Sequence, residues 1–142
     1  MDIKWLLGFI EGEGSFMINK SIIKNKYLII QPTFKISLHA NDKEVIYKIQ
    51  EFLKMGNINF KRPQRIGSSH QYEFSIRNIN DCMKLRDLLI NEDFHTKKRL
   101  DFLKWSSILD MIHNKEHYNP SVKQDILNIV KTMNLRGIGS EK

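Results

Sequence analysis

The sequence contains few cysteines, glycines and prolines and no long apolar run. One cysteine, Cys82, stands among 142 residues, which excludes an internal disulfide framework and a zinc site built from several cysteines. We expect this thiol to be buried. Seven glycines and three prolines are too few for a fibrous or low-complexity protein. The apolar runs span only a few residues, which excludes a transmembrane helix and predicts no membrane partner.

Acidic residues are also in deficit, and this deficit points to a polyanionic partner. The chain has 23 lysines and arginines against 16 aspartates and glutamates, a net charge of +7. Such an excess favours nucleic acid ahead of an anionic membrane surface, and of the two we expect nucleic acid as the partner. The length and the 41% hydrophobic content fit one globular domain over residues 1–142. We expect residues 136–142 to be a frayed tail.

The apolar periodicity predicts an α+β domain in which helices back one face of an antiparallel sheet. The expected strands are residues 15–20, 27–39, 57–62 and 70–77, with basic connections at 21–26 and 63–69. Pro32 predicts an edge or a bulge. The expected helices lie at residues 4–12, 41–55, 81–91, 97–113 and from 120 onward, with Gly14 and Gly56 ending the first two and Asn41 capping the second. The element order is therefore αββαββ followed by three helices, with Trp5 and Trp105 in the core.

The face of the sheet turned away from the helices should carry polar side chains of a particular kind. Most are amides, hydroxyls or bases, which pair with base edges in the major groove and with phosphate oxygens. They are Asn19, Gln31, Thr33, Lys35, Ser37, His39, Asn57, Asn59, Lys61, Gln71, Glu73, Ser75 and Arg77. The loops at the rim, with the strand ends next to them, add the cations Lys20, Lys24, Lys26, Arg62 and Arg65. We predict binding of double-stranded DNA, against the alternative of an ordinary solvated sheet face.

The first predicted helix combines glycines on one face with carboxylates at its C-terminal end. Gly8 and Gly12 lie four residues apart and would let another backbone approach closely. Glu11 and Glu13 oppose the helix dipole there, which a hard cation with oxygen ligands would relieve. The alternative is that both glutamates are exposed turn residues. His113 and His117 have a metal-ligand spacing, but no partner ligand stands at motif distance.

Residues 6–14, LLGFIEGEG, followed by Ser15 and Phe16, resemble the signature of the LAGLIDADG homing endonucleases. The similarity continues through FKISLH at 34–39 and TKKRLDF at 96–102, and covers residues 6 to about 112. It implies a four-stranded, saddle-shaped DNA-binding sheet in an αββαββα fold. It also implies that Glu13 is catalytic and binds metal with the Gly12 carbonyl, that Glu11 is structural, and that Lys97, in preference to Lys98, lies near the scissile phosphate.

The resemblance leaves one position unassigned. The family often has a polar residue near Leu38 to position water, and Lys35 or His39 could take that role here.

Only one copy of the signature is present, so the resemblance implies a homodimer that cuts both strands of a near-palindromic DNA site. The first helices would pack across a two-fold axis through Leu7, Gly8, Glu11 and Gly12. The implied cofactor is Mg²⁺; Mn²⁺ or Ca²⁺ could substitute in binding, with Ca²⁺ not supporting cleavage. Two alternatives remain: an RNA maturase that binds its own intron RNA, and a DNA-binding protein that has lost cleavage.

The N-terminus resembles neither a signal peptide nor a transit peptide. We therefore expect an intracellular protein, in an organelle (mitochondrion or chloroplast) or in the cytoplasm of a microbial or phage host.

Overall fold

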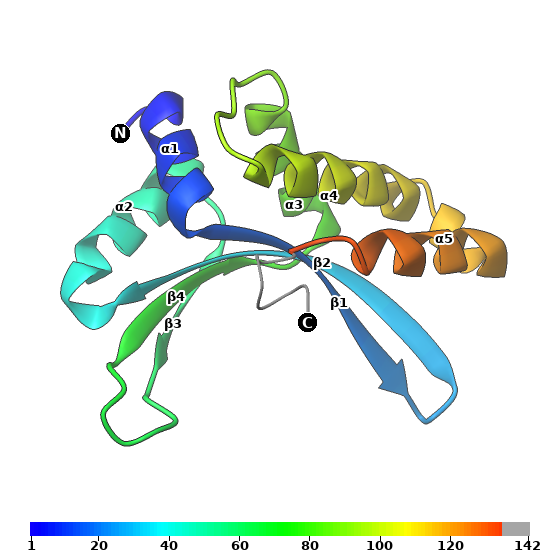
Figure 1. Cartoon of the computed structure of the whole chain (residues 1–142), viewed down its shortest axis with the longest axis horizontal. Coiled ribbons are helices and arrows are strands. Elements are labelled where there is room, and N and C mark those ends of the chain that lie inside the picture. The colour runs from blue at the N-terminus through cyan, green and yellow to red at the C-terminus, as the bar shows by residue number, and fades with distance from the viewer. Residues whose placement is uncertain (135–142) are drawn as a thin grey trace.

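A computed structural model of the chain describes residues 1–134, and it consists of an arched antiparallel sheet with every helix above it (Figure 1). The sheet order is β1-β2-β4-β3, with the strands β1 (Gly14–Ile23), β2 (Tyr27–His39), β3 (Asn57–Lys61) and β4 (Gln71–Ile76). The helices are α1 (Ile3–Glu13), α2 (Lys43–Leu53), α3 (Ile79–Leu89), α4 (Lys98–His113) and α5 (Pro120–Val130), with 3-10 turns at Ala40–Asp42 and Glu116–Tyr118. The predicted α+β fold and element order are confirmed. The predicted tail at 136–142 lies outside the described residues.

Polar caps fix where three helices begin. The Asp2 carboxylate accepts a hydrogen bond from the Trp5 amide at 2.8 Å, and Asn78 and Asn119 cap α3 and α5 in the same way. The predicted cap at Asn41 is wrong. A 3-10 turn precedes α2, and the Asn41 amide donates instead to Nδ1 of His39 at 3.0 Å.

Aromatic rings fill the space between the sheet and α4. Phe16 packs against Phe34, Phe102 and Trp105, with ring centroids 5.0–5.2 Å apart. All four side chains are at most 1% exposed and belong to one hydrophobic cluster. The prediction for Trp105 is thus confirmed. The prediction for Trp5 is wrong, because α1 turns this side chain outward and leaves it 47% exposed.

The β1–β2 hairpin is longer than the sequence predicted. Strand pairing continues to Ile23 opposite Tyr27, so the connection shrinks to residues 24–26. Lys24 and Asn25 both adopt positive φ, which matches the right-handed twist of the flanking strands in a tight hairpin. Pro32 pairs with Ile18, and pairing with β4 starts only at Phe34. The proline therefore lies where one side of β2 is free, as expected.

Neighbouring atoms leave no room for a side chain at two glycine positions. Gly14 is extended (φ −83°) rather than left-handed, but a Cβ there would lie 3.0 Å from the Ile10 carbonyl oxygen. α1 therefore passes directly into β1. α2 ends at Leu53, and Gly56 follows at φ +97°, where a Cβ would lie 2.4 Å from the Phe74 ring.

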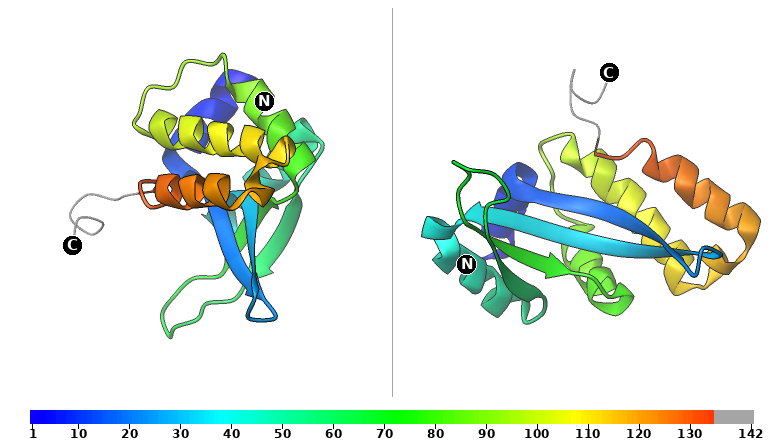
Figure 2. Two further views of the ribbon diagram at one scale, coloured as in Figure 1. Left: turned by 90° about the vertical axis from the view of Figure 1, so that its right-hand side faces the viewer. Right: turned by 90° about the horizontal axis from the view of Figure 1, so that it is seen from below.

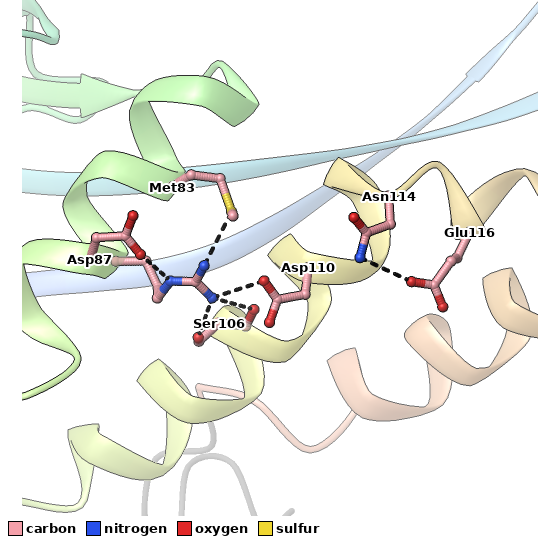
Figure 3. Close-up of polar contacts among 7 residues, drawn as sticks. Met83, Asp87, Ser106, Asp110, Asn114 and Glu116 are labelled. Carbon is pink, nitrogen blue, oxygen red and sulfur yellow. Dashed lines mark hydrogen bonds and ion pairs between the residues drawn. The ribbon is translucent and has the colours of Figure 1, made fainter.

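A partly buried guanidinium joins α3 to α4. Arg86 donates from its η nitrogen to Ser106 Oγ and Asp110 Oδ1, both at 3.0 Å, and from Nε to Asp87 at 2.8 Å. Figure 3 shows these contacts converging from the two helices. They hold α4, which carries part of the candidate site, against the rest of the helical layer. No helix among residues 1–134 is long and apolar enough to cross a membrane.

Candidate active site and nucleic-acid interface

Glu13 and Lys97 line the same cavity, although they are 84 positions apart in the sequence. The cavity measures about 580 Å³ and lies where α1 ends, β1 begins and α4 starts. Glu13 is the last residue of α1 and Lys97 is the N-cap of α4, and both side chains are exposed. The predicted catalytic pair is thus brought together. Lys98, which the sequence offered as the second choice after Lys97, lines the cavity as well. The sequence did not indicate a role for the cavity residues Ser15, Leu100, Asp101, Lys104, Thr132 and Asn134.

Glu11 fixes the backbone that carries Lys97. Its Oε1 accepts three hydrogen bonds, from the His95 amide at 2.8 Å, the Thr96 amide at 2.7 Å and the Thr96 hydroxyl at 2.8 Å. Burial alone would raise the pKa of Glu11, but the Thr96 and His95 contacts outweigh it and lower the pKa. The carboxylate is therefore committed to the loop directly before Lys97, as a structural role requires.

Three side chains attach α4 and the segment after α5 to β1. Lys98 donates to the Gly14 carbonyl, Trp105 Nε1 to the Met17 carbonyl at 3.1 Å, and Asn134 to the Phe16 carbonyl at 2.9 Å. Because β1 follows Glu13 directly, these bonds hold the two walls of the cavity in register.

The oxygen donors of this cavity fit half of a magnesium site. Glu13 offers a carboxylate and Gly12 a backbone carbonyl at the C-terminal end of α1, where the helix dipole favours cations. Mg²⁺ usually takes one or two protein carboxylates together with substrate phosphates. Residues 1–134 contain no group of three or more His, Cys, Asp or Glu that could hold a metal ion. One chain thus supplies part of such a site.

The outer face of α1 is apolar and has no partner within the described chain. Trp5 stacks on Phe9 with centroids 5.1 Å apart, and a Cβ on Gly8 or Gly12 would meet no atom within 4 Å. This is the face on which the sequence predicted close approach of a second helix. Leu7 does not belong to it, because the side chain is 5% exposed and packs in the chain's own core.

Strand register places the predicted polar residues in rows on one face of the sheet. Asn19 pairs with Gln31, Lys35 with Ser75, Ser37 with Glu73, and His39 with Gln71. On the other side of β4, Ser75, Glu73 and Gln71 pair with Asn57, Asn59 and Lys61. We call this concave side of the sheet, opposite the helices, the recognition face. In the view from below in Figure 2, β1 and β2 run side by side along the length of the molecule.

Four predicted contact residues are not available on this face. Thr33, Glu73 and Ser75 are at most 2% exposed, because neighbouring side chains of the concave sheet cover them. Thr33 accepts a hydrogen bond from Asn19 at 2.8 Å. Lys20 pairs with Ile30 and lies beside α5, on the opposite side of the sheet, because β1 runs past it instead of turning.

Glu73 is instead a buried counter-ion for three cations of the recognition face. Its Oε2 lies 2.9 Å from Lys61 Nζ and 3.5 Å from Lys35 Nζ, and its Oε1 lies 3.8 Å from an Arg77 nitrogen. Burial would raise its pKa, but Lys61 and Lys35 outweigh burial and lower the pKa. The carboxylate is thus charged at neutral pH and draws the three cations together.

The two hairpin connections carry the predicted rim cations. Lys24 and Lys26 lie in the β1–β2 connection, while Arg62 and Arg65 line a cavity of about 590 Å³ in the β3–β4 connection. The water-positioning role left to Lys35 or His39 gains no support. Neither residue lines the Glu13 cavity, and their polar ends contact Glu73 and the Asn41 amide.

Residues 6–109 match the family described as LAGLIDADG endonuclease. A Neurospora crassa protein named "Probable intron-encoded endonuclease 3" is 34% identical over 131 residues, which are 90% of this chain and 24% of that protein. The chain thus spans about a quarter of the length of the curated relatives it matches.

Solved structures share the whole fold. The homing endonuclease I-TnaI has a TM-score of 0.85 and 28% identity, over 99% of this chain and 92% of that one. The LAGLIDADG homing endonuclease I-GzeII, in complex with its DNA target, has a TM-score of 0.83 and 28% identity. That match covers all of this chain and 48% of the I-GzeII chain.

Proposed function

The chain belongs to the LAGLIDADG endonuclease family, and from that premise we propose that it is a site-specific double-strand DNA endonuclease acting as a homodimer. The observation that carries the proposal is the shared cavity of Glu13 and Lys97 beside the unpartnered face of α1. The reaction is phosphodiester hydrolysis, in which a water oxygen bonds to phosphorus, a phosphorus–oxygen ester bond breaks, and a proton reaches the departing sugar oxygen.

Two copies supply what one chain lacks. The faces of α1 that carry Gly8 and Gly12 pack together, and this brings two Glu13 carboxylates to one centre from opposite sides. The matched I-GzeII chain is about twice as long as the matched region, so it has room for a second unit within one chain. Here a second copy of the chain takes that place.

Endonucleases of this family depend on divalent metal ions, and we propose Mg²⁺ for this chain. Glu13 and the Gly12 carbonyl would hold it, and the ion would stabilise the charge that develops on the phosphate oxygens during in-line displacement. Lys97 lies on the facing wall of the cavity and neutralises charge on the scissile phosphate. Glu11 keeps Lys97 there through the 95–96 backbone.

The recognition face binds the duplex, with amide and basic side chains toward base edges and loop cations toward phosphates. Two copies carry twice the charge of one, +14, so affinity falls steeply as salt rises. An intracellular location, in whichever compartment holds the target DNA, belongs to the same proposal.

The RNA maturase alternative is not favoured. The relatives are named endonucleases, and a pure RNA binder would need neither Glu13 nor Lys97 in one cavity. Loss of cleavage is likewise not favoured, because both side chains are present and face the same space.

The test is a cleavage assay on a site selected from a randomised duplex library in Ca²⁺. The wild type should linearise a plasmid carrying that site in Mg²⁺ or Mn²⁺, and not in Ca²⁺. Glu13→Gln should keep binding in Ca²⁺ and lose at least about 100-fold in cleavage rate, as loss of a group that stabilises transition-state charge does. The matched control is Glu51→Gln, an exposed glutamate on α2, which should cleave like the wild type. Cleavage by Glu13→Gln at the wild-type rate would contradict the assignment.

A further inference from the structure

Large apolar side chains gather at the far end of the recognition face. Ile23, Tyr27 and Ile29 are 47%, 55% and 42% exposed. Ile23 pairs with Tyr27, and Ile29 pairs with Ser21, so all three share the face of the next polar pair, Asn19 and Gln31. We call these three residues the tip patch. It continues the polar rows described above and changes their chemistry from polar to apolar.

The core does not account for the tip patch. α5 covers the other side of the hairpin, where Ile22 and Leu28 line a cavity with Leu127. The patch itself faces away from that helix, which leaves apolar surface in water.

Cations flank the tip patch on its own hairpin. Lys24 and Lys26 occupy the connection, and the Lys26 ammonium lies 5.5 Å from the centre of the Tyr27 ring. An occupant must therefore offer negative charge and apolar groups side by side. A duplex does so, because its phosphates border a major groove in which the thymine C5-methyl is the apolar group on display. A second copy of the same tip would bring lysines against lysines.

We propose that the tip patch reads thymine methyl groups in the outer part of each half-site. This rests on the proposed function and specifies part of its substrate. β1 starts beside Glu13, and Ser21 and Ile23 lie seven and nine residues beyond Gly14. At about 3.3 Å per residue they are roughly 23–30 Å away. At about 3.4 Å per base pair, the patch meets pairs some seven to nine positions from the cleavage centre.

The test removes the methyl groups from the DNA and leaves the protein unchanged. The probe is the duplex selected from a randomised library in Ca²⁺, with deoxyuridine replacing thymidine at the seventh to ninth pairs of each half-site. The duplex that the wild-type protein selects should contain T·A pairs at these positions. Replacing thymidine by deoxyuridine there should weaken binding about fourfold for each contacted methyl, which corresponds to one buried apolar carbon. Deoxyuridine placed elsewhere in the half-site should have a smaller effect.

Protein variants connect the effect to the patch. Ile29→Ala should show a smaller difference in affinity between the thymidine and deoxyuridine duplexes than the wild type does, because Ile23 and Tyr27 remain. Ile90→Ala, which alters an isoleucine of similar exposure (40%) at the end of α3, should keep the wild-type preference.

Wild-type binding that ignores deoxyuridine at these positions, or a selected site without T·A pairs there, would overturn the inference while leaving the endonuclease proposal intact. Dissociation of the protein by Ile29→Ala, seen by sedimentation, would also overturn it and assign the patch to contact between copies. Failure of the wild type to select any duplex would refute the proposed function itself, and the inference with it.

Discussion

Replacing Glu73 by glutamine isolates the contribution of one buried charge to stability. The variant keeps the shape of the side chain and removes its negative charge, while Lys35, Lys61 and Arg77 remain. The carboxylate is 2% exposed and its shortest contact is the 2.9 Å bond to Lys61.

The magnitude follows from these contacts. A hydrogen bond between charged groups contributes about 1.5–3 kcal/mol. The contacts to Lys35 and Arg77 are longer, at 3.5 and 3.8 Å, and add less because they exceed the length of a charged hydrogen bond. Burying an amide costs less than burying a carboxylate, which offsets part of the loss. We expect Glu73→Gln to lower the free energy of unfolding by about 2 kcal/mol at pH 7.

The pH dependence gives the test its sign. Folding lowers the pKa of Glu73. Its charge therefore stabilises the protein in full at pH values above the pKa of glutamate in the unfolded chain, about 4.3. That stabilisation disappears as the pH falls through the lower, folded pKa. Glutamine does not titrate, so the difference between wild type and variant should shrink below about pH 4.

Urea unfolding followed by tryptophan fluorescence, at pH 7 and at about pH 3.5, measures both quantities. Glu51→Gln, an exposed position on α2, should change stability by less than about 0.5 kcal/mol. Equal stability of Glu73→Gln and wild type at pH 7, or a difference that stays constant with pH, would refute the reasoning.

Three further substitutions probe separate parts of the fold. Glu11→Gln weakens three hydrogen bonds to the loop before Lys97, so the cleavage rate should fall about tenfold while DNA binding in Ca²⁺ is retained. An equal loss of cleavage rate and of DNA affinity would contradict a positioning role. Gly8→Leu adds a side chain where a Cβ meets no atom within 4 Å, so each copy should keep its fold, seen as an unchanged circular dichroism spectrum. Sedimentation should nevertheless show monomers, and a dimer of wild-type affinity would exclude this face. Gly56→Ala should lower the free energy of unfolding by more than about 1 kcal/mol, because φ is +97° and the Cβ meets the Phe74 ring; unchanged urea unfolding would disprove the steric argument.

Periodicity predicted which face of the sheet a residue occupies, but not how deeply it lies. The alternation along β2 and β4 correctly separates Phe34 and Phe74 from Lys35 and Glu73. Depth depends on neighbours across strands, because a concave face crowds its central side chains. Glu73 is therefore covered by lysines from β2 and β3, and no pattern within β4 alone carries that information.

Local signals also could not decide between packing inside the chain and packing against a partner. Trp5 and Leu7 both lie on a short, almost wholly apolar helix, and only the tertiary structure shows which of them faces outward. The error at Lys20 arose from the length of a turn. The tight connection after Ile23 keeps β1 extended, so alternation puts Lys20 on the helix side.

The bonds from Lys98 and Asn134 to the Gly14 and Phe16 carbonyls of β1 have a consequence for aggregation. β1 is an edge strand, and a bare edge invites pairing with a strand of another molecule, the route to aggregation. Side chains from outside the sheet donate hydrogen bonds to these carbonyls, so the first residues of β1 are less able to pair with another strand. In the proposed homodimer, two copies would therefore meet through α1 and not through pairing of their β1 edges.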